Sequence, residues 1–175
     1  MSDGSLNNVF DPSQVELLFV DDDDEFRSTA VQRFARRGFH VRAAAGVNDA
    51  LRLLQDRQFD VVVSDMAMPG LTGINLLQRV KELSPECEVI LLTGEGTVET
   101  AVQAMKLGAY DFLSKPFSLA ELETHIQKAY ERRRLNQENV QLKAVLERTQ
   151  PKLRMVGESL AMQEVFKLIA KAGPS

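Results

Sequence analysis

The chain has 175 residues, of which 44% are hydrophobic, and a formal net charge of −4 at pH 7. This composition supports a sizeable core, excludes wholesale disorder and argues against a surface that binds nucleic acid throughout. The single cysteine, Cys87, excludes an internal disulfide, and the two histidines are too far apart in sequence to suggest a zinc cluster. No apolar run approaches the ~20 residues that cross a bilayer, and the polar N-terminus carries no evident signal peptide. We therefore expect a soluble, cytoplasmic protein without a membrane partner.

Short apolar segments alternate with amphipathic segments over most of the chain. The apolar segments, each about the length of a strand buried on both faces, are residues 15–20, 39–44, 60–64, 88–93 and 110–114. The amphipathic segments between them predict helices, two of which end at Gly38 and Gly108. This alternation predicts an α/β fold with a parallel sheet and helices on both faces.

A long helix is predicted after the last strand, because residues 118–148 contain neither glycine nor proline. Ser118 and Glu121 have the spacing of a capping box at its start. Four residues farther along follow the 4-3-4 spacing of a coiled-coil seam: Leu135, Asn139, Leu142 and Leu146. We expect this seam to join two copies of the chain, with Asn139 favouring one register. The alternative is a solvated helix with a few incidental leucines.

The segment that follows is basic, with seven basic and three acidic side chains in residues 131–154. Such an excess is compatible with DNA binding, but charges that flank a coiled coil give the same pattern. We expect no direct nucleic-acid binding. Residues 157–173 predict one further amphipathic helix, with Ser159 as its N-cap and Gly173 as its end.

Polar residues follow the predicted strands at the points where they end. They are Asp21 and Asp22 after the first strand, Asp65 after the third, Thr93 after the fourth and Lys115 after the fifth. The carboxyl ends of parallel strands share one edge of a sheet, so we expect these side chains to converge there. Three clustered carboxylates repel one another, and Mg²⁺, which prefers oxygen ligands, would relieve that repulsion.

A carboxylate in such a cluster can also accept a phosphoryl group, whose charge the metal, a lysine and a hydroxyl would offset. Taken singly, each residue has a plainer explanation. Aspartates after a strand often cap the next helix, and Asp23, Asp24 and Glu25 are expected to favour a helix N-terminus. Asp65 alone could be a loop residue and Lys115 a surface lysine. Their joint placement at successive strand ends favours the magnesium-dependent phospho-acceptor.

The segments VDDDDEF, VVSDMAMPGLTG, ILLTGEG and FLSKPF together resemble the receiver domain of two-component response regulators, over about residues 14–130. The resemblance implies a doubly wound, flavodoxin-like sheet of five parallel strands in the order 2-1-3-4-5. It also implies that a sensor histidine kinase phosphorylates Asp65. Magnesium would then be held by Asp21, Asp22, Asp65 and the backbone carbonyl of Ala67.

The same resemblance assigns roles to three further positions. Thr93 would contact the phosphoryl oxygens, and Lys115, before a cis Pro116, would pair with them. Phe112 matches an aromatic position that turns inward when Thr93 moves. The face formed by residues 96–130 would carry the signal outward and, with the long helix, form a homodimer.

The C-terminal stretch MVGESLAMQEVFKLIAKAGPS resembles the opening of the AAA+ ATPase domain of NtrC-type activators of sigma-54 RNA polymerase. No G-x-x-x-x-G-K-[ST] motif occurs, so we expect no ATP hydrolysis by this chain. The expected role is a non-enzymatic switch for a downstream ATPase and transcription. The expected parts are a flexible N-terminus (1–13), a receiver domain (14–130), a helical linker (131–150) and a truncated AAA+ start (151–175).

Two other classes of protein remain compatible with parts of this pattern. A haloacid-dehalogenase-like phosphatase also begins with a strand ending in D-x-D, here Asp21 and Asp23, and would use Asp21 as its nucleophile. A purely structural dimerisation module would keep the receiver fold and the long helix without accepting phosphate.

Overall fold

The structure, a computed structural model, describes residues 9–149, 163–165 and 167–168. A 3-10 turn, Pro12–Gln14, precedes the sheet. The strands are β1 (Glu16–Val20), β2 (His40–Ala44), β3 (Val61–Asp65), β4 (Glu88–Thr93) and β5 (Asp111–Ser114). The helices are α1 (Asp24–Arg36), α2 (Val47–Asp56), α3 (Gly73–Leu83), α4 (Val98–Lys106) and α5 (Leu119–Thr149). Each strand lies within one residue of its predicted limits.

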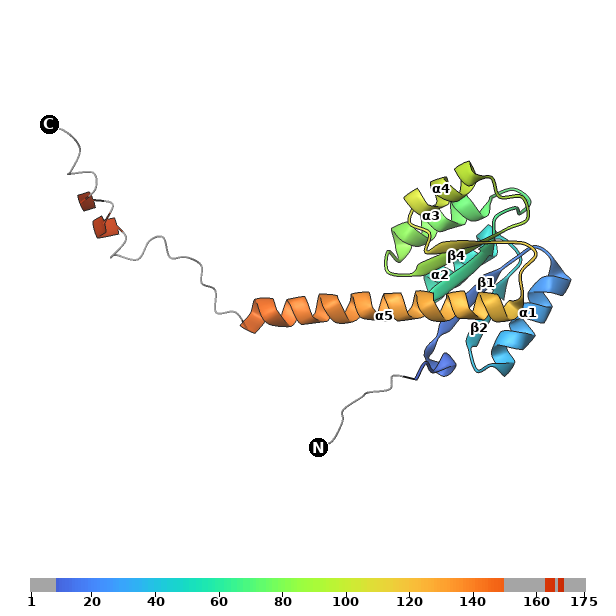
Figure 1. Ribbon diagram of the computed structural model, residues 1–175, viewed down its shortest axis with the longest axis horizontal. Helices are drawn as coiled ribbons and strands as arrows, with labels where there is room; N and C mark the ends of the chain where they lie inside the picture. The colour runs from blue at the N-terminus through green and yellow to red at the C-terminus, as the bar shows by residue number, and fades with distance from the viewer. Residues whose placement is uncertain (1–8, 150–162, 166, 169–175) are drawn as a thin grey trace. The chain divides into compact units, whose positions relative to one another are not determined.

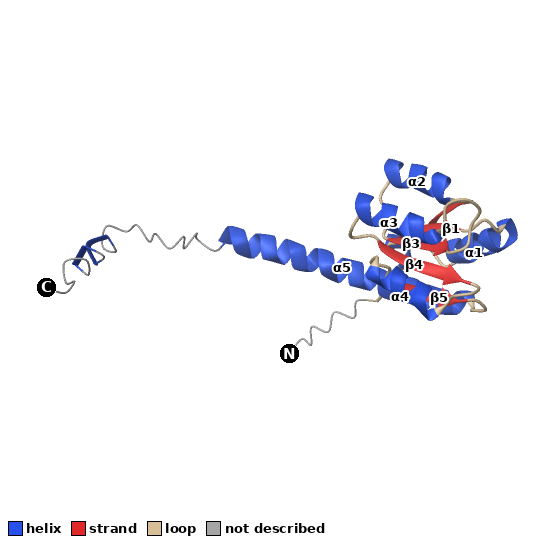
Figure 2. Cartoon of the chain, turned by 90° about the horizontal axis from the view of Figure 1, so that it is seen from above, coloured by secondary structure: helices blue, strands red, loops and turns tan. Residues whose placement is uncertain are grey.

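The sheet is entirely parallel and has the strand order β2-β1-β3-β4-β5 that the family resemblance implies. Helices cover both of its faces (Figure 1). Because side chains alternate along a strand, Leu17 and Phe19 point to the face covered by α1 and α5. Leu18 and Val20 point to the other face, toward α2, α3 and α4. Figure 2 shows the sheet and these helices from above. The doubly wound fold predicted from the sequence is therefore confirmed.

Burial differs between the central and the edge strands. Nearly every residue of β1, β3 and β4 is buried, as expected for strands covered on both faces. In β2 only Ala44 is fully buried, and in β5 only Leu113. The expectation that all five strands are buried on both faces is therefore wrong for the two edge strands, which have a neighbouring strand on one side only.

Helix α5 runs through the long glycine- and proline-free segment, as predicted. At its start the Ser118 hydroxyl oxygen accepts a hydrogen bond from the Glu121 amide at 3.0 Å. Its first turns bury three residues: Leu122, Ile126 and Ala129. The leucines of the predicted seam are exposed, with exposed fractions of 53% for Leu135, 61% for Leu142 and 58% for Leu146. Because exposure fits both a seam and a solvated helix, the dimer seam stays a prediction.

The chain divides into two compact units, residues 1–137 and 138–175. The first unit extends beyond the expected receiver limit at residue 130 and includes the middle of α5. Residues 163–165 and 167–168 are helical. The predicted caps Ser159 and Gly173, and most of the predicted AAA+ start, lie outside the described residues. Among the residues that are described, no helix is both long and apolar enough to cross a membrane.

Candidate functional site

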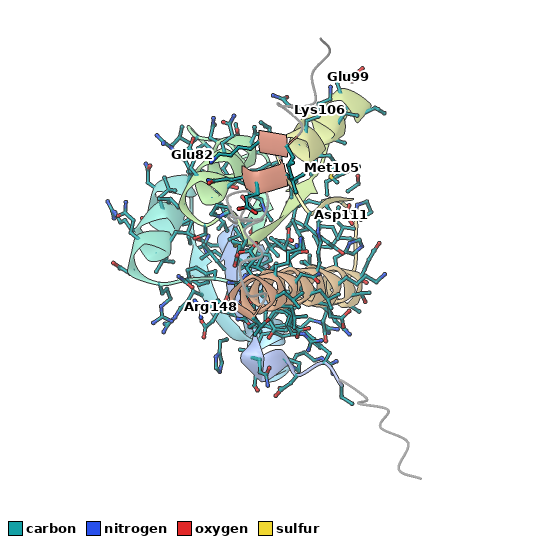
Figure 3. All side chains as sticks on the ribbon, turned by 90° about the vertical axis from the view of Figure 1, so that its left-hand side faces the viewer. Glu82, Glu99, Met105, Lys106, Asp111 and Arg148 are labelled. Carbon is teal, nitrogen blue, oxygen red and sulfur yellow. The ribbon has the colours of Figure 1, made fainter. Side chains whose placement is uncertain are left out.

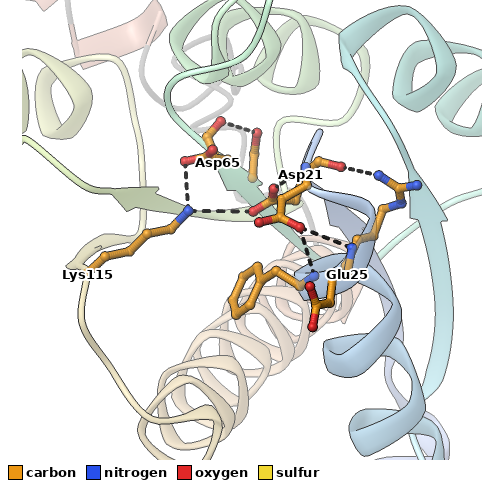
Figure 4. Close-up of polar contacts among 8 residues, drawn as sticks. Asp21, Glu25, Asp65 and Lys115 are labelled. Atoms are coloured by element: carbon orange, nitrogen blue, oxygen red, sulfur yellow. Dashed lines mark hydrogen bonds and ion pairs between the residues drawn. The ribbon is translucent and has the colours of Figure 1, made fainter.

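Four strand ends bring the predicted site residues together at the carboxyl edge of the sheet. Carboxylate oxygens of Asp21, Asp22 and Asp65 all lie within 4.8 Å of one another. Lys115 extends toward them from the end of β5, with its Nζ 3.5 Å from Asp65 Oδ1 and 3.7 Å from Asp21 Oδ2 (Figure 4). Thr93 is buried at the end of β4. The three aspartates and Lys115 therefore converge as expected from the sequence.

The four consecutive aspartates after β1 have different surroundings. Asp21 is completely buried and its Oδ1 accepts a hydrogen bond from the Asp23 amide at 2.9 Å. Asp22 is exposed and contributes a carboxylate to the cluster. Asp23 caps α1, since its Oδ1 accepts from the amides of Glu25 and Phe26 at 3.0 Å each. The first two aspartates thus belong to the carboxylate cluster, as the metal-site explanation predicted. The third caps α1, as the plainer explanation predicted.

Two side chains of α1 hold parts of the site in place. Arg27 pairs with Asp24 and donates through Nη1 to the Asp21 carbonyl at 2.6 Å, which fixes the backbone where β1 ends. The Phe26 ring lies beneath the Lys115 ammonium, with Nζ 5.3 Å from the ring centroid. A cation above an aromatic face is stabilised by the ring quadrupole. Sequence reasoning assigned no role to either residue. Only the i, i+3 spacing of Asp24 and Arg27 could have indicated their ion pair from the sequence.

The electrostatics of the cluster favour a bound cation. Burial raises the pKa of Asp21, and the negative charges of Asp65 and Asp22 raise it further. The hydrogen bond from Asp23 and the charge of Lys115 act in the opposite direction. Asp21 Oδ2 is buried without a hydrogen-bond partner among the described residues. A buried carboxylate oxygen that accepts no hydrogen bond, together with two neighbouring carboxylates, is a suitable set of hard ligands for Mg²⁺.

Two glycines allow close packing around the acceptor, and sequence reasoning missed both. A Cβ on Gly73, the first residue of α3, would collide with the Asp65 carbonyl and lie 2.9 Å from Met66 Cα. A Cβ on Gly96 would lie 2.9 Å from Thr93 Cγ2. Both residues stand in the quoted motifs, but only the folded backbone shows that Gly73 and Gly96 touch the site.

The remaining predicted positions lie around this centre. The Lys115–Pro116 peptide bond is cis, as expected. Phe112, half-buried on β5, lines a hollow of about 520 Å³ with Lys106 and four apolar residues of α4. These are Val98, Ala101, Val102 and Met105. Figure 3 labels Met105 and Lys106 on this helix. Ala67, whose carbonyl is expected to bind the metal, is exposed in the loop after Asp65.

Residues 17–127 match the family described as the response regulator receiver domain. The chain belongs to this family. Its homologues are response regulators of the NtrC, NtrX and DctD types. Receiver domains bind Mg²⁺ in an acidic pocket, and Asp21, Asp22 and Asp65 form such a pocket here. The phosphatase alternative is therefore wrong, and Asp23, which it requires at the active site, caps α1 instead.

Three relatives illustrate the similarity of this receiver domain to known proteins. The C4-dicarboxylate transport transcriptional regulatory protein DctD of Pseudomonas aeruginosa is 41% identical over 87% of the chain and 33% of its own length. The crystal structure of NtrX from Brucella abortus in complex with ATP is 32% identical, with a TM-score of 0.70 over 92% of this chain and 35% of NtrX. The beryllofluoride-activated NtrC4 receiver domain dimer is 38% identical, with a TM-score of 0.64 over 67% of this chain and 97% of its own. The chain spans about a third of the length of the curated relatives it matches.

Proposed function

We propose that this receiver domain is a switch that accepts a phosphoryl group on Asp65 from a sensor histidine kinase. The observation that carries the proposal is the position of the Lys115 ammonium, between Asp65 and Asp21 at 3.5 and 3.7 Å. Asp22 completes a cluster of three carboxylates, and Lys115 is the one cation that pairs with the cluster among the described residues, so the negative charges outnumber the positive one by two. An excess of charge at a strand-end pocket is typical of a site built for a metal and a phosphoryl group.

The side chains of the site have separate tasks in this proposal. An Asp65 carboxylate oxygen forms the bond to phosphorus while the bond between phosphorus and the donor's imidazole nitrogen breaks. The Lys115 ammonium and the Thr93 hydroxyl receive the new phosphoryl oxygens. Asp21, Asp22, Asp65 and the Ala67 carbonyl would hold Mg²⁺, which supplies further compensation of negative charge. Beyond this self-phosphorylation and a slow autodephosphorylation, no turnover is proposed.

The output of the switch is proposed to be a change in how two copies associate. Support comes from the exposed apolar side chains of α4 beside Phe112, within the face of residues 96–130, and from the exposed leucines of α5. The related solution structure is that of a beryllofluoride-activated NtrC4 receiver domain dimer. In the full-length protein, this association would control a downstream AAA+ ATPase of a sigma-54 activator and hence transcription.

The test of phospho-acceptance is intact mass spectrometry after incubation with Mg²⁺ and acetyl phosphate. We expect one phosphoryl adduct on the wild type and none on Asp65→Asn or in the presence of a chelator. Asp24→Asn is the matched control, because Asp24 belongs to the same aspartate run but is exposed and paired with Arg27. It should be modified like the wild type. A wild type that stays unmodified and does not bind beryllofluoride would support the structural dimerisation module instead.

The test of the output is the dimer dissociation constant with and without beryllofluoride, measured by analytical ultracentrifugation. We expect tighter association with beryllofluoride and a weaker response when Leu142 is replaced by serine. Identical constants in both conditions would contradict a switch that acts through association of this chain.

A further inference from the structure

A second charged cluster lies at the amino edge of the sheet, opposite the phosphorylation site. Asp60 directly precedes β3, and its carboxylate pairs with Arg133 of α5. The side chains of both partners are only 13% exposed. The second oxygen of Asp60 accepts a hydrogen bond from the Glu16 amide at 2.8 Å. This partly buried pair ties the start of the central strands to the long helix.

Glu88 repeats this arrangement one strand away. It is the first residue of β4, and its side chain is 6% exposed. Glu88 Oε1 lies 3.5 Å from Arg132 Nε, and Glu88 Oε2 lies 3.7 Å from Lys81 Nζ. The Arg132 guanidinium also lies 5.5 Å from the centre of the Tyr110 ring. Two neighbouring strands are thus each bound to α5 through a buried carboxylate.

The two arginines are consecutive, so they leave the helix about 100° apart around its axis. Contacts in two directions fix the rotation of a helix as well as its distance from the sheet. One turn farther on, the Gln137 side chain donates to Glu86 at 3.1 Å. The predicted seam begins at Leu135, between these contacts. These contacts therefore hold α5 against the sheet from Arg132 to Gln137.

The same two strands hold the phosphorylation chemistry at their other ends. Asp60 directly precedes β3 and Asp65 is its last residue, and Glu88 and Thr93 are the first and last residues of β4. The partners on each strand are five residues apart, which corresponds to about 17 Å of extended chain. The strands that present the acceptor and the hydroxyl are therefore also those that hold the output helix.

We propose that Asp60, Glu88, Arg132 and Arg133 form an amino-edge clamp that fixes the rotation of α5. The clamp holds α5 up to Gln137 in one orientation against β3 and β4, so that movement of these strands rotates this part of the helix. A planar guanidinium suits this task because it pairs in a defined orientation. Arg132 and Arg133, two of the basic residues of segment 131–154, thus pair with carboxylates of the same chain. The consequence for dimerisation rests on the proposed function, but the fixing of the helix does not.

The first test measures the helix in a single chain. Spin labels are placed on cysteines introduced at the exposed positions Gln78 and Asn136, and the labelled chain is diluted with unlabelled chain. Double electron–electron resonance should give one narrow distance distribution in the parent. Asp60→Asn and Arg133→Gln should each lose that narrow distribution. Arg79→Gln is the control, because its pair with Glu82 has the same chemistry but is about two-thirds exposed.

Phosphorylation of each variant by acetyl phosphate reports whether the fold is intact. If Arg133→Gln does not fold, Arg133→Lys replaces it, because lysine keeps the charge but lacks the planar fork. A narrow distribution retained in every folded clamp variant would overturn the proposal. Equal broadening in Arg79→Gln would overturn it as well.

The second test separates the clamp from the proposed switch. The beryllofluoride-induced change in the dimer dissociation constant is measured for the wild type and for Arg133→Gln. We expect the variant to lose this change while Asp65 still accepts a phosphoryl group. An unaltered response in the variant would overturn the coupling. If the wild type itself shows no response, the proposed function fails and the distance measurement alone decides whether the clamp exists.

Discussion

Both edges of the sheet carry clustered charged side chains. Carboxylates outnumber cations in the cluster at the carboxyl edge, and cations outnumber carboxylates in the cluster at the amino edge. At the carboxyl edge, Asp21, Asp22 and Asp65 form a cluster, and Lys115 is the one cation that pairs with it among the described residues; Asp21 Oδ2 has no hydrogen-bond partner among them. At the amino edge, the carboxylates contact more cations than they number. There Asp60 and Glu88 pair with Lys81, Arg132 and Arg133.

This difference shows that burial of a carboxylate does not by itself indicate function. Asp21 and Glu88 are both buried acidic residues at the ends of central strands. The one at the amino edge is neutralised by the protein, so it contributes to structure. The one at the carboxyl edge is left for an external cation and a phosphoryl group to neutralise. If the edges differ in this way, the stability of the protein should respond differently to changes of charge or volume at each edge.

The largest expected effect is at the amino edge. Arg133→Met leaves the Asp60 carboxylate buried without its charged partner, which should lower the free energy of unfolding by about 3–5 kcal/mol. Arg79→Met breaks an exposed pair and should cost about 0–1 kcal/mol. Urea unfolding followed by circular dichroism measures both. Equal losses would mean that the amino-edge pair is no more important to stability than a surface ion pair.

The carboxyl edge should respond to metal instead. Mg²⁺ at about 100 times its Kd should raise the free energy of unfolding of the wild type by about 2.7 kcal/mol, because it binds only the folded chain. Asp21→Asn should abolish this gain. Because burial and neighbouring carboxylates raise the pKa of Asp21, its charged form is disfavoured in the metal-free protein. The same substitution should therefore stabilise the metal-free protein at neutral pH.

Urea unfolding with and without Mg²⁺ distinguishes these effects. Asp24→Asn serves as the control and should keep the full response to Mg²⁺, since Asp24 lies outside the cluster. A metal-free Asp21→Asn protein that is less stable than the wild type would show that the carboxyl edge is not repulsive.

A smaller effect is expected when volume is added beside the acceptor. Gly73→Ala places a methyl group against the Asp65 carbonyl and Met66, and overpacking of this kind costs about 1–3 kcal/mol. Phosphorylation by acetyl phosphate should also slow, because the backbone of Asp65 must shift. Gly46→Ala is the matched control, since a Cβ there meets nothing within 4 Å. Equal stability and equal phosphorylation rates in the two variants would contradict the close packing of α3 on the acceptor.

The sequence was sufficient to predict the carboxyl edge but not the amino edge. In a parallel sheet every strand delivers its last residue to one edge, so Asp65, Thr93 and Lys115 could be placed together from strand limits alone. The pairing of Arg133 with Asp60 joins residues 73 positions apart. It depends on how α5 lies across the sheet, and the local charge pattern of 131–154 contains no information about that.

The sequence alone likewise does not show which strands lie at the edges of the sheet or which glycines pack against the site. The apolar pattern of 39–44 predicts a strand, but it does not show that β2 has a neighbour on one side only. Gly73 and Gly96 are visible as letters, whereas their contacts with Asp65 and Thr93 arise only when helix and loop pack on the strand ends. Local periodicity therefore gives the elements, and long-range packing decides which residues hold the site in position.

The smallest expected effect concerns Cys87, whose alkylation tests whether water reaches the amino edge of the sheet. Cys87 directly precedes β4, and burial raises its pKa to about 12, although Lys81 and Arg133 act to lower it. Because the thiolate is the reactive form, only roughly one thiol in ten thousand is ionised at pH 8. Iodoacetamide should therefore leave the native protein unmodified and alkylate the urea-unfolded chain fully, as measured by intact mass.

Arg133→Met should allow slow alkylation of Cys87 if the Arg133 side chain helps to close this edge. Rapid alkylation of the native wild type at pH 8 would show that water reaches the start of β4, and the contrast between a closed, neutralised edge and an open, charged one would fail.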